Sequence, residues 1–386
     1  MLFSEVIGNS ELKERLVNSV AQNRVSHAQL FIGPEGCGNL PMALAYAQYL
    51  NCEQPGIEDS CGQCASCLKA SKYVHPDIHF TFPFIFNEKE KRMICSDWLV
   101  EWREFLEKNP YGDYNSWIRS IGKENKQGNI NAKECGDILH RLSFTTYESA
   151  HKILILWLPE FLVKEGNRLL KLIEEPPEKT IFLFVGHNPD RILNTILSRM
   201  QALRFNRLSD NEVVQGLVKS DGLTPESAAN IAVLSNGNLG RARDLINVSS
   251  SNHTAELYHW LVLCAKPSVT ELMRWGDDFS KLGREEQKVF LFYSIHVFRE
   301  ILLMLNGAAS LNRLTEEELN LASRLSKKLS TEGITEILST LDQYIYYVER
   351  NASGKILATS LCIEMMHLFR NQASRKKLAF FKEMYV

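Results

Sequence analysis

Hydrophobic positions in the first half of the chain alternate between helical spacing and short unbroken apolar runs. Residues 9–24 begin with a polar cap and continue with leucine and valine at helical spacing, which predicts a helix. The apolar run Ala28–Ile32 follows and predicts a buried strand, and Met42–Leu50 again has a helix-like pattern. A short apolar strand is expected after His75–Phe80. Strand and helix therefore alternate from the start.

The same alternation returns further along the chain. The run beginning at Lys152 and the run Thr180–Val185 predict buried strands, and Gly166–Glu175 between them predicts a helix that two prolines stop. Residues 188–201 turn through a loop into a short helix that ends at a Ser-Arg pair. Because strands and helices alternate in this way, we predict an α/β fold with a parallel sheet.

The remainder of the chain has only helical patterns. These patterns predict a base domain over residues 1–207, a small helical unit over 208–248 and an all-α domain over 249–386, with a serine run as the linker. Residues of about 85–128 form an aromatic and charged insertion in the base domain. Its aromatic side chains either pack an inserted helical pair on the host domain or mark a partner surface.

A glycine-rich loop follows the first predicted strand and has the frame of a phosphate-binding loop. Gly33, Gly36 and Gly38 are in place, but Asn39 and Leu40 stand where the pattern G-x-x-x-x-G-K-[ST] has lysine and a hydroxyl. The lysine neutralises charge on the outer phosphates and the hydroxyl oxygen holds Mg²⁺. We therefore predict no functional ATP site, although the backbone N–H groups could still bind an anion.

The strand that begins at Lys152 lacks the acids that a nucleotide hydrolase needs. Such carboxylates hold magnesium and orient water, whereas the end of this strand has Trp157 and Leu158, and the nearest acid is Glu160, beyond a proline. Lysine, hydroxyl and strand-end acids are all missing. The chain is therefore not expected to hydrolyse ATP.

Four of the nine cysteines lie close together with the spacing C-x8-C-x2-C-x2-C. Cys52, Cys61, Cys64 and Cys67 fall in a segment of glycine and proline that suits a tight knuckle, residues 52–67. Four thiolates complete a tetrahedral zinc shell and leave no position for water. We therefore predict a structural Zn²⁺ site rather than a catalytic one.

Composition narrows the remaining possibilities only slightly. A net charge of -2 and a pI near 6.6 provide no overall attraction to DNA or to a membrane, so any such contact requires a local patch or a partner. The first residues lack the basic start and apolar core of a signal peptide, and no apolar run approaches a membrane span. A cytoplasmic protein is expected.

Taken in order, the motifs resemble the clamp-loader branch of the AAA+ ATPases, and within it the delta-prime family of bacterial DNA polymerase III subunits. The resemblance covers nearly the whole chain. It rests on the glycine loop, the cysteine knuckle and three short motifs: His75-Pro76-Asp77, Leu169-Leu170-Lys171-x-x-Glu174-Glu175-Pro176-Pro177 and Ser198-Arg199.

The resemblance implies an AAA+ base with the zinc knuckle, a helical lid and a helical collar that joins a pentameric ring. Its partners would be the gamma/tau and delta subunits, and the assembly would load the sliding clamp onto primed DNA. Delta-prime proteins typically lack an ATPase of their own. In this family a Ser-Arg-Cys motif supplies an arginine to the neighbouring subunit's ATP site, and here it reads Ser198-Arg199-Met200. The resemblance thus implies a role in trans for Arg199.

Two alternatives remain. A gamma/tau-type ATPase would need the lysine, hydroxyl and acids that this chain lacks. A zinc-dependent nucleic-acid-binding protein would need a basic face, whereas Lys69 and Lys72 near the knuckle are outweighed by Glu53, Glu58 and Asp59. Both alternatives are less consistent with the motifs.

Overall fold

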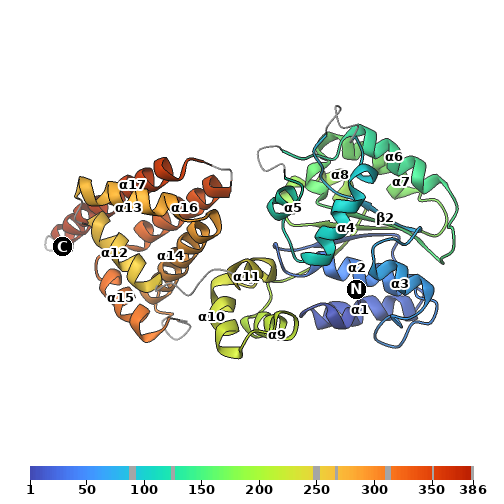
Figure 1. Ribbon diagram of the computed structural model, residues 1–386, viewed down its shortest axis with the longest axis horizontal. Helices are drawn as coiled ribbons and strands as arrows, with labels where there is room; N and C mark the ends of the chain where they lie inside the picture. The colour runs from blue at the N-terminus through green and yellow to red at the C-terminus, as the bar shows by residue number, and fades with distance from the viewer. Residues whose placement is uncertain are drawn as a thin grey trace. The chain divides into compact units, whose positions relative to one another are not determined.

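The chain forms two compact units, Met1–Arg243 and Asp244–Val386, shown in the ribbon diagram of Figure 1. This computed structural model describes residues 1–86, 93–122, 127–246, 253–265, 268–308, 314–349 and 352–383. Two helices of the expected lid, Asp210–Asp221 and Pro225–Ser235, fall within the first unit, and the third, Leu239–Ile246, crosses the boundary between the units. The expected serine linker, Ser249–Ser251, lies outside the described residues.

A five-stranded parallel sheet forms the centre of the first unit. Its spatial order is β2-β3-β4-β1-β5, and every pairing is parallel. The strands are β1 (Ala28–Ile32), β2 (Ile78–Thr81), β3 (Lys152–Trp157), β4 (Thr180–Gly186) and β5 (Gln201–Arg204). The predicted parallel α/β fold is confirmed.

Eleven α-helices surround this sheet or follow it in the described residues up to 246, and the last of them crosses the boundary into the second unit. They are α1 (Ser10–Ala21), α2 (Asn39–Leu50), α3 (Ala65–Ser71), α4 (Leu99–Lys108), α5 (Tyr114–Ser120), α6 (Ala132–Ser143), α7 (Leu170–Glu174), α8 (Asn194–Leu197), α9 (Asp210–Asp221), α10 (Pro225–Ser235) and α11 (Leu239–Ile246). Short 3₁₀ turns span Phe3–Glu5, Cys95–Trp98, Pro159–Phe161, Val163–Leu169 and Pro189–Arg191.

Alternate positions along β1, β3 and β4 enter two separate hydrophobic cores, one on each face of the sheet. Phe31 and Ile155 enter the core that α1, α2, α4 and α5 cover. Leu30 and Leu154 enter the core that α6, α7 and α8 cover. Because both faces are covered, β1, β3 and β4 are buried along their whole length, which explains their continuous apolar runs.

One predicted helix was wrong in its extent, and one strand was not predicted. Most of the expected helix Gly166–Glu175 divides into a 3₁₀ turn, Val163–Leu169, and the short α7. Apolar spacing over so few residues does not separate the two helix types. The strand β5, which begins at Gln201 just after the expected helix that ends at Ser-Arg, was not predicted, because only Leu203 of its four residues is buried and almost no hydrophobic pattern marks it.

The described part of the insertion packs its tryptophans inside the protein. An antiparallel bridge between Phe84 and Asn129 brings its two ends together. Trp98, Trp102 and Trp117 are at most 2% exposed. These tryptophans therefore help to form the core, as the packing alternative predicted; residues 87–92 and 123–126 of the insertion lie outside the described residues.

A buried carboxylate supports the segment that joins α6 to β3. Asp77 is only 2% exposed. One of its oxygens accepts the backbone N–H of Tyr147 at 2.6 Å, and the other accepts those of Glu148 and Ser149 at 2.9 and 3.0 Å. The ring of His75 lies 2.9 Å from the hydroxyl of Ser149. The His-Pro-Asp motif thus has a structural role here.

The second unit is helical throughout its described residues, as predicted. Its helices are α12 (His253–Ala265), α13 (Val269–Lys281), α14 (Arg284–Leu305), α15 (Glu316–Ser326), α16 (Thr331–Glu349) and α17 (Gly354–Glu383). Trp260 and Phe290 meet edge to face in its core, with ring centroids 5.3 Å apart. No helix in the described part of the chain is long and apolar enough to cross a membrane.

Candidate functional site

The glycine-rich loop lies at the carboxyl end of β1, between the ends of β4 and β5. This edge of a parallel sheet is where such folds usually bind ligands. Gly36 and Gly38 adopt φ values of 69° and 92°, which side chains other than glycine rarely allow. The predicted loop geometry is therefore present, and the neighbouring residues decide whether it can hold a nucleotide.

Asn39 and Leu40 are engaged in packing at the start of α2. They are 3% and 2% exposed. The amide nitrogen of Asn39 donates to the carbonyl of Gly186 at 3.0 Å, and its amide oxygen accepts the backbone N–H of Leu40 at 2.9 Å. Asn39 thus joins the loop to the end of β4, and Leu40 is part of the core. Neither offers a cation or a hydroxyl to a phosphate.

The nearest acid after β3 is turned toward the backbone. Glu160 is 6% exposed. One carboxylate oxygen accepts the backbone N–H groups of His187 and Asn188 at 2.5 and 2.8 Å. The other oxygen is buried and has no hydrogen-bond partner among the described residues. Glu160 therefore stabilises the turn after β4, and one of its two oxygens is committed to that turn.

Residues that open α11 cover the loop from the other side. The side chain of Asn238 packs so closely on Gly36 that a Cβ atom there would lie 1.9 Å from its amide oxygen. That oxygen also accepts the backbone N–H of Arg241 at 2.9 Å and so caps α11. The backbone N–H of Leu239 donates to the carbonyl of Gly36 at 3.2 Å. The loop is therefore in direct contact with the first turn of α11.

The insertion also reaches the loop. Tyr111 is only 5% exposed. If Gly38 carried a Cβ atom, that atom would lie 3.3 Å from an aromatic carbon of Tyr111. The Tyr111 hydroxyl accepts the backbone N–H of Ile7 at 2.8 Å. Its carbonyl oxygen would lie 2.4 Å from a Cβ at Gly240 in α11, so only glycine fits there. Three distant segments thus converge on the loop.

The four clustered cysteines meet as predicted. The Sγ atoms of Cys52, Cys61, Cys64 and Cys67 all lie within 4.8 Å of one another. Backbone N–H groups point at three of these sulfurs, at 3.3 to 3.4 Å. Hydrogen bonds of this kind lower the pKa of Cys61 to about 6, whereas burial raises the pKa of Cys67.

This geometry fits a tetrahedral metal ion. Four Zn–S bonds of about 2.3 Å place the sulfurs about 3.8 Å apart, and the sulfurs of Cys61 and Cys67 are 3.9 Å apart. Four thiolates this close would repel one another without a cation between them. The knuckle residues could therefore hold a metal ion, with each cysteine supplying one ligand.

Ser198 and Arg199 lie just beyond α8, and both are exposed. The Arg199 Nε donates to a carboxylate oxygen of Glu174, at the end of α7, at 2.5 Å. One terminal nitrogen donates to the carbonyl of Thr195 at 2.8 Å and to the Ser198 hydroxyl at 3.2 Å. An exposed arginine is therefore held by three groups of its own chain.

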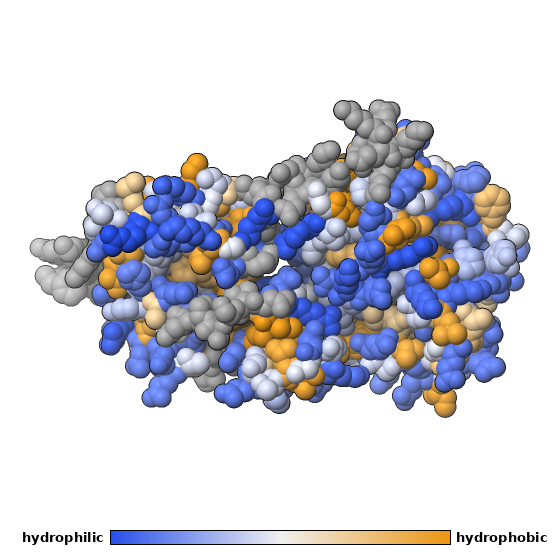
Figure 2. All heavy atoms as spheres, in the orientation of Figure 1, coloured by the Kyte–Doolittle hydropathy of each residue, from blue (hydrophilic) through white to orange (hydrophobic). Residues whose placement is uncertain are grey.

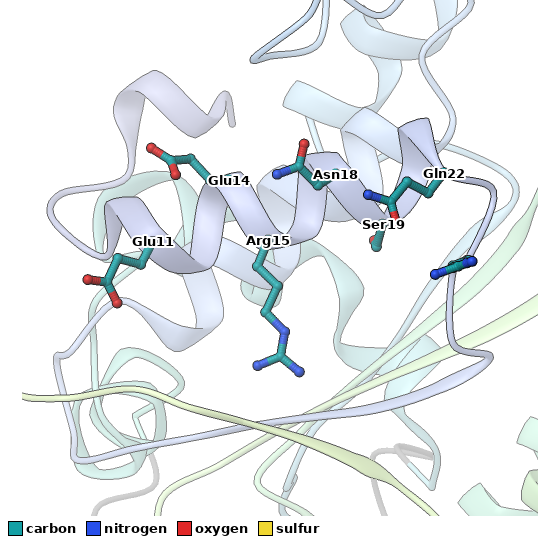
Figure 3. Close-up of a pocket in the computed structure, with 7 residues that line it drawn as sticks. Glu11, Glu14, Arg15, Asn18, Ser19 and Gln22 are labelled. Carbon is teal, nitrogen blue, oxygen red and sulfur yellow. The ribbon is translucent and has the colours of Figure 1, made fainter.

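A separate shallow hollow of about 480 Å³ lies along α1 (Figure 3). None of the predicted site residues lines it. Its lining residues are of charged or polar types, and most of those labelled in Figure 3 are exposed, namely Glu11, Glu14, Arg15, Asn18 and Gln22, whereas Ser19 is half-buried. Ligand sites are usually concave and largely apolar, so this hollow is not a candidate site.

Residues 8–209 match the sequence model of a protein family described as DNA polymerase III, delta subunit. This chain belongs to that family. The resemblance that the motifs predicted is therefore confirmed at the level of the family. The match spans the sheet, the cysteine knuckle and the Ser-Arg pair, and it ends just before α9.

Individual relatives in this DNA polymerase III family are distant. The chain is 28% identical over 231 residues to DNA polymerase III subunit delta' of Bacillus subtilis, covering 60% of this chain and 56% of the relative. It is 25% identical over 250 residues to subunit tau of the same organism, covering 64% of this chain and 37% of the relative. The chain thus spans roughly a third to a half of these relatives, which include both kinds of subunit.

One solved structure with similarity along most of the chain is a DNA polymerase III gamma subunit-related protein from Thermotoga maritima. The match has 13% sequence identity and a TM-score of 0.39, and it covers 93% of this chain and 99% of that one. A TM-score this low supports no conclusion about function.

Sequence reasoning missed the residues that cover the loop. Tyr111 lies in the insertion and Asn238 in the small helical unit over 208–248, and nothing in their local sequence connects them with Gly36 or Gly38. A weak signal existed in Gly240, since a glycine inside a helix is often a site of close backbone approach.

Proposed function

We propose that this chain is a delta-prime-type subunit of a DNA polymerase III clamp loader that does not hydrolyse ATP itself. Two observations support this proposal: the family to which the chain belongs, and the residues that replace and cover the phosphate-binding positions of its own glycine-rich loop. Asn39 and Leu40 are buried in place of the lysine and hydroxyl, and Asn238 packs directly on Gly36. A phosphate at this loop would lack the lysine and the hydroxyl of the motif, and Asn238 would obstruct its approach to Gly36.

We propose that three parts of the chain have separate roles. Residues 1–207 form the AAA+-type base, 208–248 the lid and 249–386 a collar for assembly. The partners are the gamma/tau and delta subunits in a pentameric ring, acting in the cytoplasm on a sliding clamp and primed DNA. The tau and delta' relatives support partners and processes of this kind.

The proposed metal is a structural Zn²⁺ bound by the four cysteines of the knuckle. Zinc is the ion that four thiolates in a tetrahedron most often hold in proteins. With all four positions filled by sulfur, the ion would activate no water. Its contribution would be to hold the segment between α2 and α3, which belongs to no strand of the sheet.

The proposed contribution to ATP hydrolysis is Arg199, acting in trans on the ATP site of a neighbouring subunit. The observation that best supports it is the exposed guanidinium fixed beyond α8 by Glu174 and by backbone. A guanidinium is planar and permanently charged, which suits a γ-phosphate, and an arginine supplied in trans can raise the rate by about 10³ to 10⁵. Ser198 is its motif partner.

The test is ATP turnover by a reconstituted clamp loader, with matched gamma/tau and delta subunits and primed DNA. Arg199→Ala is expected to lower kcat by at least about 10²-fold while assembly is unchanged. Arg168→Ala is the control, because Arg168 is also exposed and bound through Nε to a carboxylate, that of Glu165 at 2.7 Å. Equal turnover with Arg199→Ala and wild type would exclude the trans role.

The tau relative also supports a second candidate, an active gamma/tau-type ATPase. The two candidates separate in a simpler assay on the isolated chain. Magnesium-dependent ATP hydrolysis above a matched blank would favour the active ATPase, and its absence would favour the proposed subunit.

A further inference from the structure

We propose that Glu174 is a positioning residue for Arg199, so that the helix α7 and the Ser-Arg pair act as one unit. This inference rests on the proposed trans role of Arg199. It adds a residue to that role, and it assigns a task to the acidic end of the Leu-Leu-Lys-x-x-Glu-Glu-Pro-Pro motif.

The contacts of Arg199 divide its guanidinium into a bound part and an available part. Nε is bound to Glu174 at 2.5 Å, and one terminal nitrogen is bound to Thr195 and Ser198. A guanidinium has five N–H donors in a fixed plane. Among the described residues, no acceptor lies within hydrogen-bond distance of the other terminal nitrogen, Nη2. That nitrogen is therefore available to a phosphate of a neighbouring subunit.

Glu174 occupies a firm position from which to hold the guanidinium. The preceding residue, Ile173, is 1% exposed in the core, and its carbonyl lies 3.1 Å from the ring of His27. The backbone N–H of Glu175 donates to the carbonyl of Lys171 at 2.9 Å and so completes the last turn of α7. The two prolines that follow prevent the helix from continuing. The backbone of Glu174 is therefore fixed relative to the sheet, and its carboxylate lies within reach of Arg199.

The ion pair itself contributes little to folding. The side chains of Arg199 and Glu174 are 34% and 46% exposed, and exposed ion pairs contribute little stability because water screens them. Holding Nε does, however, fix the plane of the guanidinium. A reacting group displaced by about 1 Å can lose about 10²-fold in rate. Loss of Glu174 should therefore affect turnover much more than stability.

The experiment measures kcat and KM for ATP in the reconstituted clamp loader with Glu174→Ala, Glu174→Gln and Arg199→Ala. Glu174→Ala is expected to lower kcat by about 5- to 50-fold with KM little changed. Glu174→Gln keeps an acceptor oxygen at the same reach and should restore much of the loss. Glu175→Ala changes the adjacent exposed acid and is the matched control. Thermal melting and gel filtration verify folding and assembly.

A double variant distinguishes positioning from an independent effect. If Glu174 acts through Arg199, Glu174→Ala should cause no further loss in the Arg199→Ala background. A full further loss in that background, or unchanged kcat in the single variant, would overturn the proposal for Glu174 while leaving the trans role intact. A rise in kcat would also overturn it, because the carboxylate would then be competing with the phosphate. Unchanged kcat in Arg199→Ala would instead refute the trans role itself.

Discussion

Replacing Asp77 with alanine should destabilise the first unit by about 3 kcal/mol. The carboxylate is buried and accepts three backbone N–H groups at 2.6 to 3.0 Å. Hydrogen bonds to a charged group contribute about 1.5 kcal/mol each at the low end of their range, which gives about 4.5 kcal/mol. Water can replace part of this, since Tyr147 beside it is 82% exposed.

The assay is thermal unfolding with hydrogen exchange as a local readout. For a unit of this size, about 3 kcal/mol corresponds to a fall in Tm of about 6 to 12 °C, and the amides of residues 147–149 should exchange faster. Asp190→Ala is the control, because Asp190 is an exposed acid in a turn of the same unit. If Asp77→Ala and Asp190→Ala have the same Tm, and the amides of residues 147–149 remain protected from exchange in both, the Asp77 carboxylate does not hold this segment.

Two further predictions concern the metal and pH. Native mass spectrometry should find one zinc ion per chain. The ion should be lost in Cys64→Ser and kept in the control Cys37→Ala. A zinc content that Cys64→Ser leaves unchanged would contradict the assignment of the cluster. Burial, and then the charge of Arg141, lower the pKa of His79 to about 4. The unfolded chain therefore binds more protons between pH 6.5 and 4, and stability should fall by up to about 3 kcal/mol as the pH drops through this range. Urea unfolding of His79→Gln should show a weaker pH dependence, and an equal dependence would exclude His79 as the source.

The sequence predicted those parts of the fold that have two covered faces or a local motif. β1, β3 and β4 are buried on both sides, so their apolar runs are unbroken. The clustered cysteines were recognisable because their spacing is itself the signal. β5 was missed because it contacts the sheet on one side only and buries a single residue, Leu203.

The environment of the loop could not be predicted in the same way. The absence of lysine and hydroxyl was visible locally, since it depends on two adjacent positions. The contact of Asn238 with Gly36, and that of Tyr111 with Gly240, join residues far apart in the chain. No spacing rule relates such positions, because the sheet and the insertion bring them together only after folding.

The arrangement of α4, α5 and β3 also gives the first unit an optical signature. The indole rings of Trp102 and Trp117 lie 5.2 Å apart at 87°, and that of Trp157 in β3 lies 5.1 Å from Trp102. Chromophores this close and this inclined couple their electronic transitions, and the coupling appears as paired bands of opposite sign in circular dichroism. Undocking of the insertion from the sheet would remove the contribution of the Trp102–Trp157 pair, even if both parts retained their secondary structure, whereas the Trp102–Trp117 pair lies within the insertion itself. The tryptophans thus provide an intrinsic probe of the insertion, without any added label.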